Sequence, residues 1–378
     1  MYLKRLGLEQ FRCYQRADIH LGPGLHVLAG ANASGKTSVL EAIYLLAATK
    51  SHRTNSDRDL VKFGAEWGRV TGEFHTTQRG DLTVRMTLRA MNGDSGQRKT
   101  IEVNSVPRRR FADIIGQTAV VIFGPDDLNL IKGPPGGRRH YLNAGISQVR
   151  PVYLDDLIRY RRALRQRNEC LKAHYNDPDM AEVLCAWDVQ LVDCAASVSA
   201  GREDFIRALA PHLKAIHRDL SGQTEDIEIA YDSDLSQAVG MTEKRALMRE
   251  LLESSLDRDL RLGRTSRGPH RDDIDLTIDG KSVRAFGSQG QQRTAALALT
   301  LAEARVIEQW SGETPIVLLD DCLSELDETR ARKALELTRS VEQVIVTTAS
   351  WDRLLDEYAG AARVYNVSGG QIGERGTE

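Results

Sequence analysis

A glycine-rich stretch near the N-terminus carries the clearest chemical signal in the chain. Residues 30–37 read GANASGKT, which fits the pattern G-x-x-x-x-G-K-[ST] of a phosphate-binding P-loop. Backbone N–H groups of such a loop close around phosphate oxygens, and the start of the following helix adds a favourable dipole. We expect the ammonium group to reach the β- and γ-phosphates of ATP and the threonine hydroxyl to bind Mg²⁺. The predicted nucleotide cradle comprises Gly30, Ala31, Asn32, Ala33, Ser34, Gly35, Lys36 and Thr37.

Two aspartates follow an apolar run far along the chain. Residues 315–319 (PIVLL) predict a buried strand that ends at Asp320 and Asp321. We expect Asp320 to hold the Mg²⁺ shell, as a Walker-B aspartate does, and Asp321 to be the general base that orients the attacking water. Because most of the chain separates this pair from Lys36, a large segment is inserted between the two motifs.

A third motif precedes the acidic strand. Residues 286–293 read FGSQGQQR and are followed by a predicted helix at 290–309. The turn resembles the signature of ABC-type ATPases, in which one subunit caps the γ-phosphate held on the P-loop of another. Ser288 offers a hydroxyl, Gly290 allows close backbone approach, and Gln291 belongs to the same turn. An ordinary helix cap would explain the same residues.

The order of the motifs distinguishes these alternatives. After Asp321, residues 324–327 (SELD) resemble a D-loop, and a predicted strand at 343–348 ends at Thr348, where ABC-type proteins place a switch residue. P-loop, signature, acidic strand, D-loop and switch strand follow one another as in an ABC-type head. This order predicts a nucleotide site shared by two subunits, and therefore an ATP-dependent homodimer.

The elements that position these motifs fall into three segments. Residues 1–137 predict an ATPase lobe with the P-loop and alternating antiparallel strands, residues 138–262 a helical arm domain, and residues 263–378 the part that completes the ATPase lobe. The fold class is therefore α/β: an ABC-type P-loop ATPase head, with a mixed sheet lobe and a parallel core, and an inserted helical arm. The arm helices are expected at 151–173, 180–219 and 241–262.

Composition narrows the class of protein. The chain has 378 residues, 41% of them hydrophobic, and a formal net charge of −2, so its bulk charge does not indicate nucleic-acid binding. The five cysteines include no C-x-x-C pair, which argues against a zinc site or a disulfide framework. No apolar run approaches the ~18 residues of a membrane span, and no signal peptide is evident. We expect a cytoplasmic protein with no membrane partner.

Blocks distributed over nearly the whole chain resemble one family, the RecF ATPases of bacterial recombinational repair. The blocks match in type and in order. They are 11–14 (FRCY), 49–54 (TKSHRT), 123–128 (FGPDDL), 132–135 (KGPP), 138–139 (RR), 141–143 (YLN), Tyr160, 166–168 (QRN), 268–273 (GPHRDD), 288–293 (SQGQQR), 319–321 (LDD) and 324–327 (SELD).

The resemblance implies an ATP-dependent DNA-binding protein of repair and replication. Such a protein binds DNA at gaps and at single-strand–duplex junctions, and with RecO and RecR it promotes RecA loading and SOS induction. ATP binding is its main function and any DNA-stimulated hydrolysis is weak. The resemblance also places Arg12 against the nucleotide. Ala33 departs from the glycine usual in the family's P-loop. Alternatives are a transporter ATPase subunit, a chromosome-maintenance ATPase head, and a P-loop enzyme that phosphorylates a small molecule.

Arginines in and near the arm are the candidate DNA contacts. Arginine binds phosphate well, and nothing in the pattern indicates base readout. The alternative is a solvated helix face on which Asp155 and Asp156 pair with the arginines. A second basic group, before the signature, either braces the arm or faces the nucleotide: Arg264, Arg267, His270 and Arg271. The predicted DNA-binding set is Arg159, Arg161, Arg162, Arg165, Arg138 and Arg139.

Overall fold

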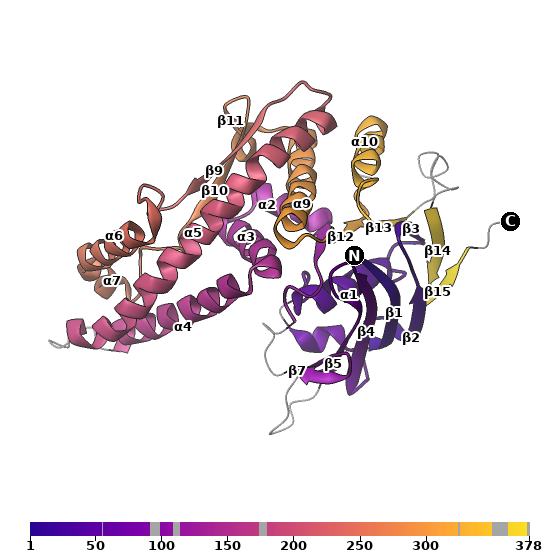
Figure 1. The fold of residues 1–378 in the computed structure, drawn as a ribbon, viewed down its shortest axis with the longest axis horizontal. Coiled ribbons are helices and arrows are strands. Elements are labelled where there is room, and N and C mark those ends of the chain that lie inside the picture. Colours follow the sequence, from indigo (N-terminus) through magenta and orange to yellow (C-terminus); the bar gives the residue numbers. More distant parts are fainter. Residues whose placement is uncertain are drawn as a thin grey trace.

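The chain folds into a head built on two large sheets and an arm of long helices (Figure 1). In the view of Figure 1 the arm extends to the left of the head, and the N-terminus and the last described strand, β15, lie in the head. The computed structural model describes residues 1–54, 56–90, 99–108, 114–173, 180–323, 326–349 and 362–375.

A six-stranded sheet forms the core of the head. Its strands are parallel except for the edge pair β14–β15, and the central strands are buried along their length, as in sheets covered on both faces. The carboxyl ends of parallel strands meet at one edge, so the P-loop after β3 and the aspartates at the end of β12 are brought together. The order is β15 (Gln371–Glu374), β14 (Ala362–Ser368), β3 (Gly24–Ala29), β13 (Gln343–Thr348), β12 (Ile316–Asp320) and β8 (Val120–Phe123).

A second, antiparallel sheet covers the P-loop helix α1 (Lys36–Ala48). The long strands β4 and β5 alternate buried and partly exposed residues, which confirms the half-buried strands predicted from their pattern. Side chains such as Leu46 of α1 pack against this sheet. Its order is β2 (Tyr14–His20), β1 (Tyr2–Phe11), β4 (Trp67–Thr76), β5 (Gly80–Arg89), β6 (Lys99–Val103) and β7 (Val106–Arg108); η1 (Asp57–Leu60) lies between α1 and β4.

The arm contains the predicted helices and one strand that the sequence did not reveal. Strand β9 (Ile227–Asp232) pairs with β10 (Asp273–Ile278), and β11 (Lys281–Ser282) completes a three-stranded sheet. The short β9, with exposed residues at every second position, lies among segments of strong helical pattern. The helices are α3 (Pro135–Val149), α4 (Pro151–Ala173), α5 (Met180–Ser221), α6 (Gly240–Ser254) and α7 (Leu256–Leu262).

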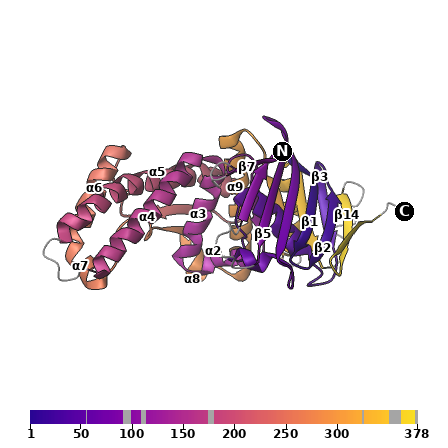
Figure 2. The ribbon, with the colours of Figure 1, turned by 90° about the horizontal axis from the view of Figure 1, so that it is seen from below.

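Helix α9 (Gln289–Ser311) connects the arm to the head. It packs against α3, α5 and β8, and its middle is buried. Figure 2 shows α9 between the arm helices and the sheets of the head. No helix in the described part of the chain has the length and apolar character that a membrane crossing requires. The remaining elements are η3 (Pro125–Asp127), α2 (Leu128–Lys132), α8 (Val283–Phe286) and α10 (Glu328–Thr338).

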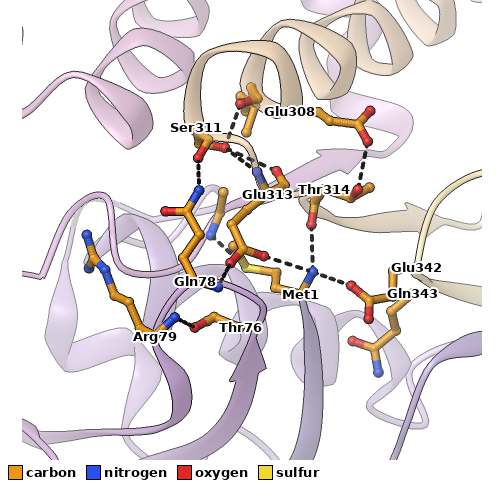
Figure 3. A network of polar contacts seen from close by, with 12 residues as sticks. Met1, Thr76, Gln78, Arg79, Glu308, Ser311, Glu313, Thr314, Glu342 and Gln343 are labelled. Atoms are coloured by element: carbon orange, nitrogen blue, oxygen red, sulfur yellow. Dashed lines mark hydrogen bonds and ion pairs between the residues drawn. The ribbon is translucent and has the colours of Figure 1, made fainter.

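A polar network joins the two sheets of the head at the start of β1 (Figure 3). The α-amino group of Met1 pairs with the carboxylates of Glu313 and Glu342. Gln78, in the β4–β5 turn, donates its backbone N–H to Glu313 at 2.6 Å and its side-chain amide to the carbonyl of Ser311 at 2.6 Å. The end of α9 is therefore fixed to both sheets.

Candidate functional site

The P-loop and the acidic strand meet at the carboxyl edge of the parallel sheet. The Thr37 hydroxyl donates to Asp320 Oδ1 at 3.0 Å, and the Thr347 hydroxyl of β13 donates to the same oxygen at 2.7 Å. Thr37 and Asp320, predicted as Mg²⁺ ligands from motifs far apart in the chain, thus lie within hydrogen-bonding distance. Thr347 holds the carboxylate in place from the neighbouring strand.

Backbone geometry of the P-loop depends on small residues. Gly35 has φ of +115°, and a Cβ atom there would lie 2.6 Å from the Tyr14 hydroxyl, which donates to the Gly35 carbonyl at 3.0 Å. Ala33 also lies in the left-handed region, with φ of +63°. That region costs an alanine about 1 kcal/mol relative to glycine. The loop keeps its curvature at Ala33 in spite of this cost.

Two side chains of the loop have hydrogen-bonding capacity for a phosphate. Lys36 Nζ donates to the carbonyls of Gly30 and Ala31 at 2.7 and 2.9 Å, and an ammonium group has a third N–H. The buried Ser34 Oγ has no hydrogen-bond partner in the described part of the chain. A phosphate oxygen would satisfy both groups, so the residues of this loop fit a nucleotide.

The residues at the strand edge also fit Mg²⁺. A threonine hydroxyl and an aspartate carboxylate are hard oxygen donors, and Mg²⁺ is usually held by one or two such groups together with phosphates and water. The described residues contain no group of three or more His, Cys, Asp or Glu side chains that could hold a metal by themselves. A metal here would therefore depend on the nucleotide for most of its ligands.

The predicted general base, Asp321, is the next residue along the chain. It has φ of +49°, a strained conformation for a residue other than glycine, and its backbone N–H donates to Thr347 Oγ1 at 2.9 Å. Nearby, the Gly30 N–H donates to the Thr348 carbonyl at 3.2 Å, so the switch strand ends beside the P-loop. The catalytic role of Asp321 stays a prediction.

Two carboxyl groups with raised pKa values lie near this edge: the partly buried Asp127 after β8 and the buried Glu303 in α9. Asp127 accepts the Gly124 N–H at 2.7 Å. Burial, with the charges of Asp126 and Asp320, raises the pKa of Asp127 to about 7. Burial and the charge of Asp127 raise the pKa of Glu303, within α9, to about 8.

Sequence reasoning named the segment around Asp127 but missed Glu303. The available signal was a lone carboxylate in an apolar helix: Leu299 and Ile307, one turn to either side, are fully buried.

Arg12 lies against the P-loop helix. Its guanidinium donates to both oxygens of Glu41, at 2.8 and 2.6 Å, and to the Asp59 carbonyl at 2.8 Å. Burial acts to raise the pKa of the Glu41 carboxyl, but hydrogen bonds from Arg12 and Ser51 outweigh it, so the pKa is lowered. This pair fixes the turn after β1 to α1, and contact of Arg12 with a nucleotide stays a prediction.

The signature turn is also a helix cap. Ser288 is the N-cap of α9: its Oγ accepts the Gln291 N–H at 3.2 Å, and Gln291 Oε1 accepts the Ser288 N–H at 2.8 Å. Within the described residues, no hydrogen bond joins this turn to the chain's own P-loop. Gln291 Nε2 instead donates to Glu225 at 3.0 Å. A cap and a signature are therefore compatible roles for the same residues.

Only half of the predicted D-loop can be placed. Ser324 and Glu325 lie outside the described residues, whereas Leu326 packs partly buried against the core. Asp327 caps α10 by accepting the Arg330 N–H at 2.9 Å. The D-loop is therefore followed directly by a capped helix.

The predicted DNA-binding arginines divide into two groups. The prediction for Arg138 was wrong: it is 3% exposed, and its guanidinium donates to both oxygens of Asp273 at 2.6 and 2.7 Å, so it is occupied inside the protein. Arg139 is partly exposed and donates to the Asp272 carbonyl at 2.7 Å. The four predicted arginines of α4 are exposed, and none forms an ion pair with a described residue; they are Arg159, Arg161, Arg162 and Arg165.

The basic group before the signature contains a brace for the arm. His270 Nδ1 lies 2.7 Å from the Tyr160 hydroxyl of α4, and Nε2 lies 2.9 Å from the Thr265 carbonyl. Burial lowers the pKa of His270 to about 4, so the ring is neutral and donates through Nε2. Arg267 pairs with Asp234 at 3.0 Å. His270 and Arg267 brace the arm, while Arg264 and Arg271 are exposed.

Comparisons with known proteins agree with this architecture. The family model described as RecF/RecN/SMC N terminal domain matches residues 2–372. The DNA replication and repair protein RecF of Halalkalibacterium halodurans is 38% identical over 378 residues, covering 100% of both chains. That of Geobacillus kaustophilus is 38% identical over 382 residues, covering 98% of this chain and 99% of the relative.

Solved structures give the same result. The structure of the recombination mediator protein RecF with ATP, from the RecFOR pathway, superposes with a TM-score of 0.90 at 30% identity, covering 99% of this chain and 98% of the other. An Smc head bound to the C-terminal winged-helix domain of ScpA gives a TM-score of 0.57 at 17% identity, covering 100% of this chain and 98% of the other, a likeness of fold alone.

Proposed function

Because this chain belongs to the RecF family of DNA replication and repair proteins, we propose that it is an ATP-dependent clamp on DNA at single-strand gaps and their duplex junctions. Two copies join through ATP, and the arms hold the DNA backbone. With RecO and RecR, the clamp promotes loading of RecA and supports SOS induction. ATP binding drives the function, and hydrolysis, weak and stimulated by DNA, ends it.

The P-loop half of the site binds the nucleotide within one chain. Lys36 and the backbone N–H groups of residues 30–37 hold the phosphates, and the hydroxyl of Ser34 turns toward an oxygen. Thr37 and Asp320 would hold Mg²⁺, which would supply positive charge to offset that of the phosphates. Asp321 orients the attacking water. Its carboxylate is shorter than the glutamate of most ABC-type heads, so we expect slow hydrolysis.

One observation supports the proposed dimer. The signature turn presents Ser288 and Gly290 at the partly exposed start of α9, and within the described residues it makes no hydrogen bond to its own P-loop. The turn uses its hydrogen bonds on itself and on Glu225. The N–H groups of a helix start suit a phosphate, and a second chain brings one. The partner's γ-phosphate is therefore the ligand of this turn.

The exposed arginines of α4 are the contacts for DNA. An ion pair with Asp155 or Asp156 would have favoured the solvated-face alternative, but neither aspartate forms one with a described arginine. Arg139 lies on the adjacent α3 and extends the set, whereas Arg138 does not belong to it. Contacts of this kind read the phosphate backbone and not the bases.

Sedimentation velocity with and without ATP, and with a gapped duplex, tests the proposal. We expect a monomer without ATP, a dimer with ATP, and a larger complex when the gapped duplex is added. An intact duplex of the same length and a single strand are the controls for the preferred DNA structure. A chain that stays monomeric at saturating ATP, with or without DNA, would refute the clamp.

A further inference from the structure

Glu225 lies directly behind the signature turn. It belongs to the short connection between α5 and β9, so it is part of the arm and not of the nucleotide-binding head. Its Oε1 accepts the Gln291 Nε2–H at 3.0 Å, and its side chain is 15% exposed. The arm therefore makes a direct hydrogen bond to the turn that faces the partner subunit.

This hydrogen bond determines which way the Gln291 amide faces. Gln291 Oε1 accepts the Ser288 N–H and closes the capping box, which leaves the amide N–H group without use inside the turn. The Glu225 carboxylate accepts a hydrogen bond from that N–H group. With its amide satisfied at both ends, Gln291 holds Ser288 in one arrangement, and the Ser288 hydroxyl proton stays available for an outside acceptor.

The other oxygen of Glu225 faces a buried histidine on α5. His217 is fully buried, and its Nε2 lies 3.6 Å from Glu225 Oε2, beyond hydrogen-bonding distance. In the described part of the chain, neither ring nitrogen of His217 nor Glu225 Oε2 has a hydrogen-bond partner. Among the hydrogen bonds of the described residues, Glu225 accepts through Oε1 from Gln291 and not through Oε2, so its position is coupled to that of Gln291.

We propose that Glu225 is a positioning residue that links the arm to the shared nucleotide site. It sets Gln291, and through Gln291 it sets Ser288 and Gly290 for the partner's γ-phosphate. Helix α5, which leads into this connection, packs along α4, so DNA held by α4 acts on the signature through Glu225. This inference rests on the proposed ATP-dependent dimer.

Three variants of one residue separate reach from charge. Glu225→Ala removes the acceptor, Glu225→Asp keeps the charge but is too short to reach Gln291, and Glu225→Gln keeps an acceptor oxygen at the same reach without the charge. Loss of a hydrogen bond to a charged group should raise the dissociation constant of the ATP-dependent dimer at least about tenfold for Ala and for Asp. The dissociation constant of the Gln variant should stay within about threefold of wild type.

Glu228→Ala is the matched control, because Glu228 is an exposed carboxylate on β9, close to Glu225 in the sequence. The dissociation constant comes from sedimentation across a concentration series with ATP, and nucleotide affinity of the monomer, which should be unchanged, comes from a fluorescent ATP analogue. If Ala lowers the folded fraction, the Asp and Gln variants still give the comparison.

The outcomes distinguish two failures. A wild-type chain that does not dimerise with ATP overturns the proposed function itself. A wild-type dimer with equally strong dimers of the Ala and Asp variants overturns only the role of Glu225. The role of Glu225 is supported if the Ala and Asp variants dimerise weakly and the Gln variant dimerises as wild type. A purely structural defect would not depend on whether the side chain is long enough to reach Gln291.

Discussion

The P-loop region and the signature region of this molecule use their polar groups differently. Around the P-loop, Thr37, Asp320 and Thr347 bond to one another, and Lys36 bonds to its own loop. The signature bonds to itself and to the arm, and the exposed arginines of α4 have no ion-pair partner among the described residues. One region is assembled within a single chain, whereas under the proposed function the other is completed by another molecule.

The largest expected effect tests the assembled region. Lys36→Ala removes the ammonium group that bridges the loop and reaches the phosphates, so ATP affinity of the monomer should fall by at least about a hundredfold. Isothermal titration with ATP measures it. Lys4→Ala, at an exposed lysine paired with Asp81, is the control and should bind ATP as wild type. Normal ATP affinity in the Lys36 variant would place the nucleotide elsewhere.

Much of this site could be predicted because its motifs are contiguous. The P-loop needs glycine and lysine at fixed spacing, and the aspartates end an apolar strand, so residues 30–37 and 320–321 are identifiable from the sequence alone. The alternation of strands and the spacing of helices likewise predicted most elements of both sheets and the arm.

Contacts between segments far apart in the chain could not be predicted from the sequence. Arg138 and Arg161 are the same residue type in the same region, yet Arg138 is buried against Asp273 and Arg161 is exposed. Nothing local to either residue distinguishes them, because the deciding partner is far along the chain. Glu225 was missed for the same reason: its importance comes from Gln291, and no pattern marks a carboxylate in a short connection.

The second prediction tests the open region. Ser288→Arg places a long cation where the partner's nucleotide should approach and removes the cap of α9, which costs about 1 kcal/mol. We expect the ATP-induced dimer to weaken by at least about a hundredfold while monomer ATP affinity stays unchanged. Ser254→Arg adds the same charge on an exposed turn of α6 and should dimerise normally. A normal dimer in the Ser288 variant would remove the main distinction between the two regions.

The third prediction concerns the exposed arginines. Replacing Arg161, Arg162 and Arg165 together by alanine should lower DNA affinity by about ten- to a hundredfold. The slope of log affinity against log salt should become shallower by about 0.9 for each phosphate that the variant no longer neutralises. Fluorescence anisotropy at several salt concentrations, with ATP present, measures both quantities.

Paired arginines of the same arm provide the control for this variant. They also lie at the surface, but each has a carboxylate partner within the protein: Arg207 with Asp204, Arg218 with Asp226, and Arg245 with Asp193. Replacing these three by alanine removes the same charge and should leave the salt slope close to wild type. Equal effects of the two triple variants would mean that net charge, and not the unpaired face of α4, governs binding.

The last prediction concerns stability and not binding, at the place where the two regions meet: Glu303 of α9 and Asp127 beside Asp320. The pKa of Glu303 is about 8 in the folded protein against an ordinary value of 4.5. Between these values the folded state keeps a proton that the unfolded state releases, so stability falls as pH rises, by up to about 1.4 kcal/mol per pH unit. Glu303→Gln cannot titrate and should lose that part of the slope.

Urea unfolding at pH 5, 6, 7 and 8 measures the difference, with Glu308→Gln on the same helix as control. Asp127, with a pKa of about 7, contributes a slope of the same sign and should leave a smaller dependence in the Glu303 variant. Parallel stability curves for wild type and Glu303→Gln would mean that Glu303 is charged when folded. Two negative charges, on Asp127 beside the P-loop region and on Glu303 of the signature helix, would then repel each other inside the protein. This repulsion would weaken the contact between the two regions at neutral pH without any ligand.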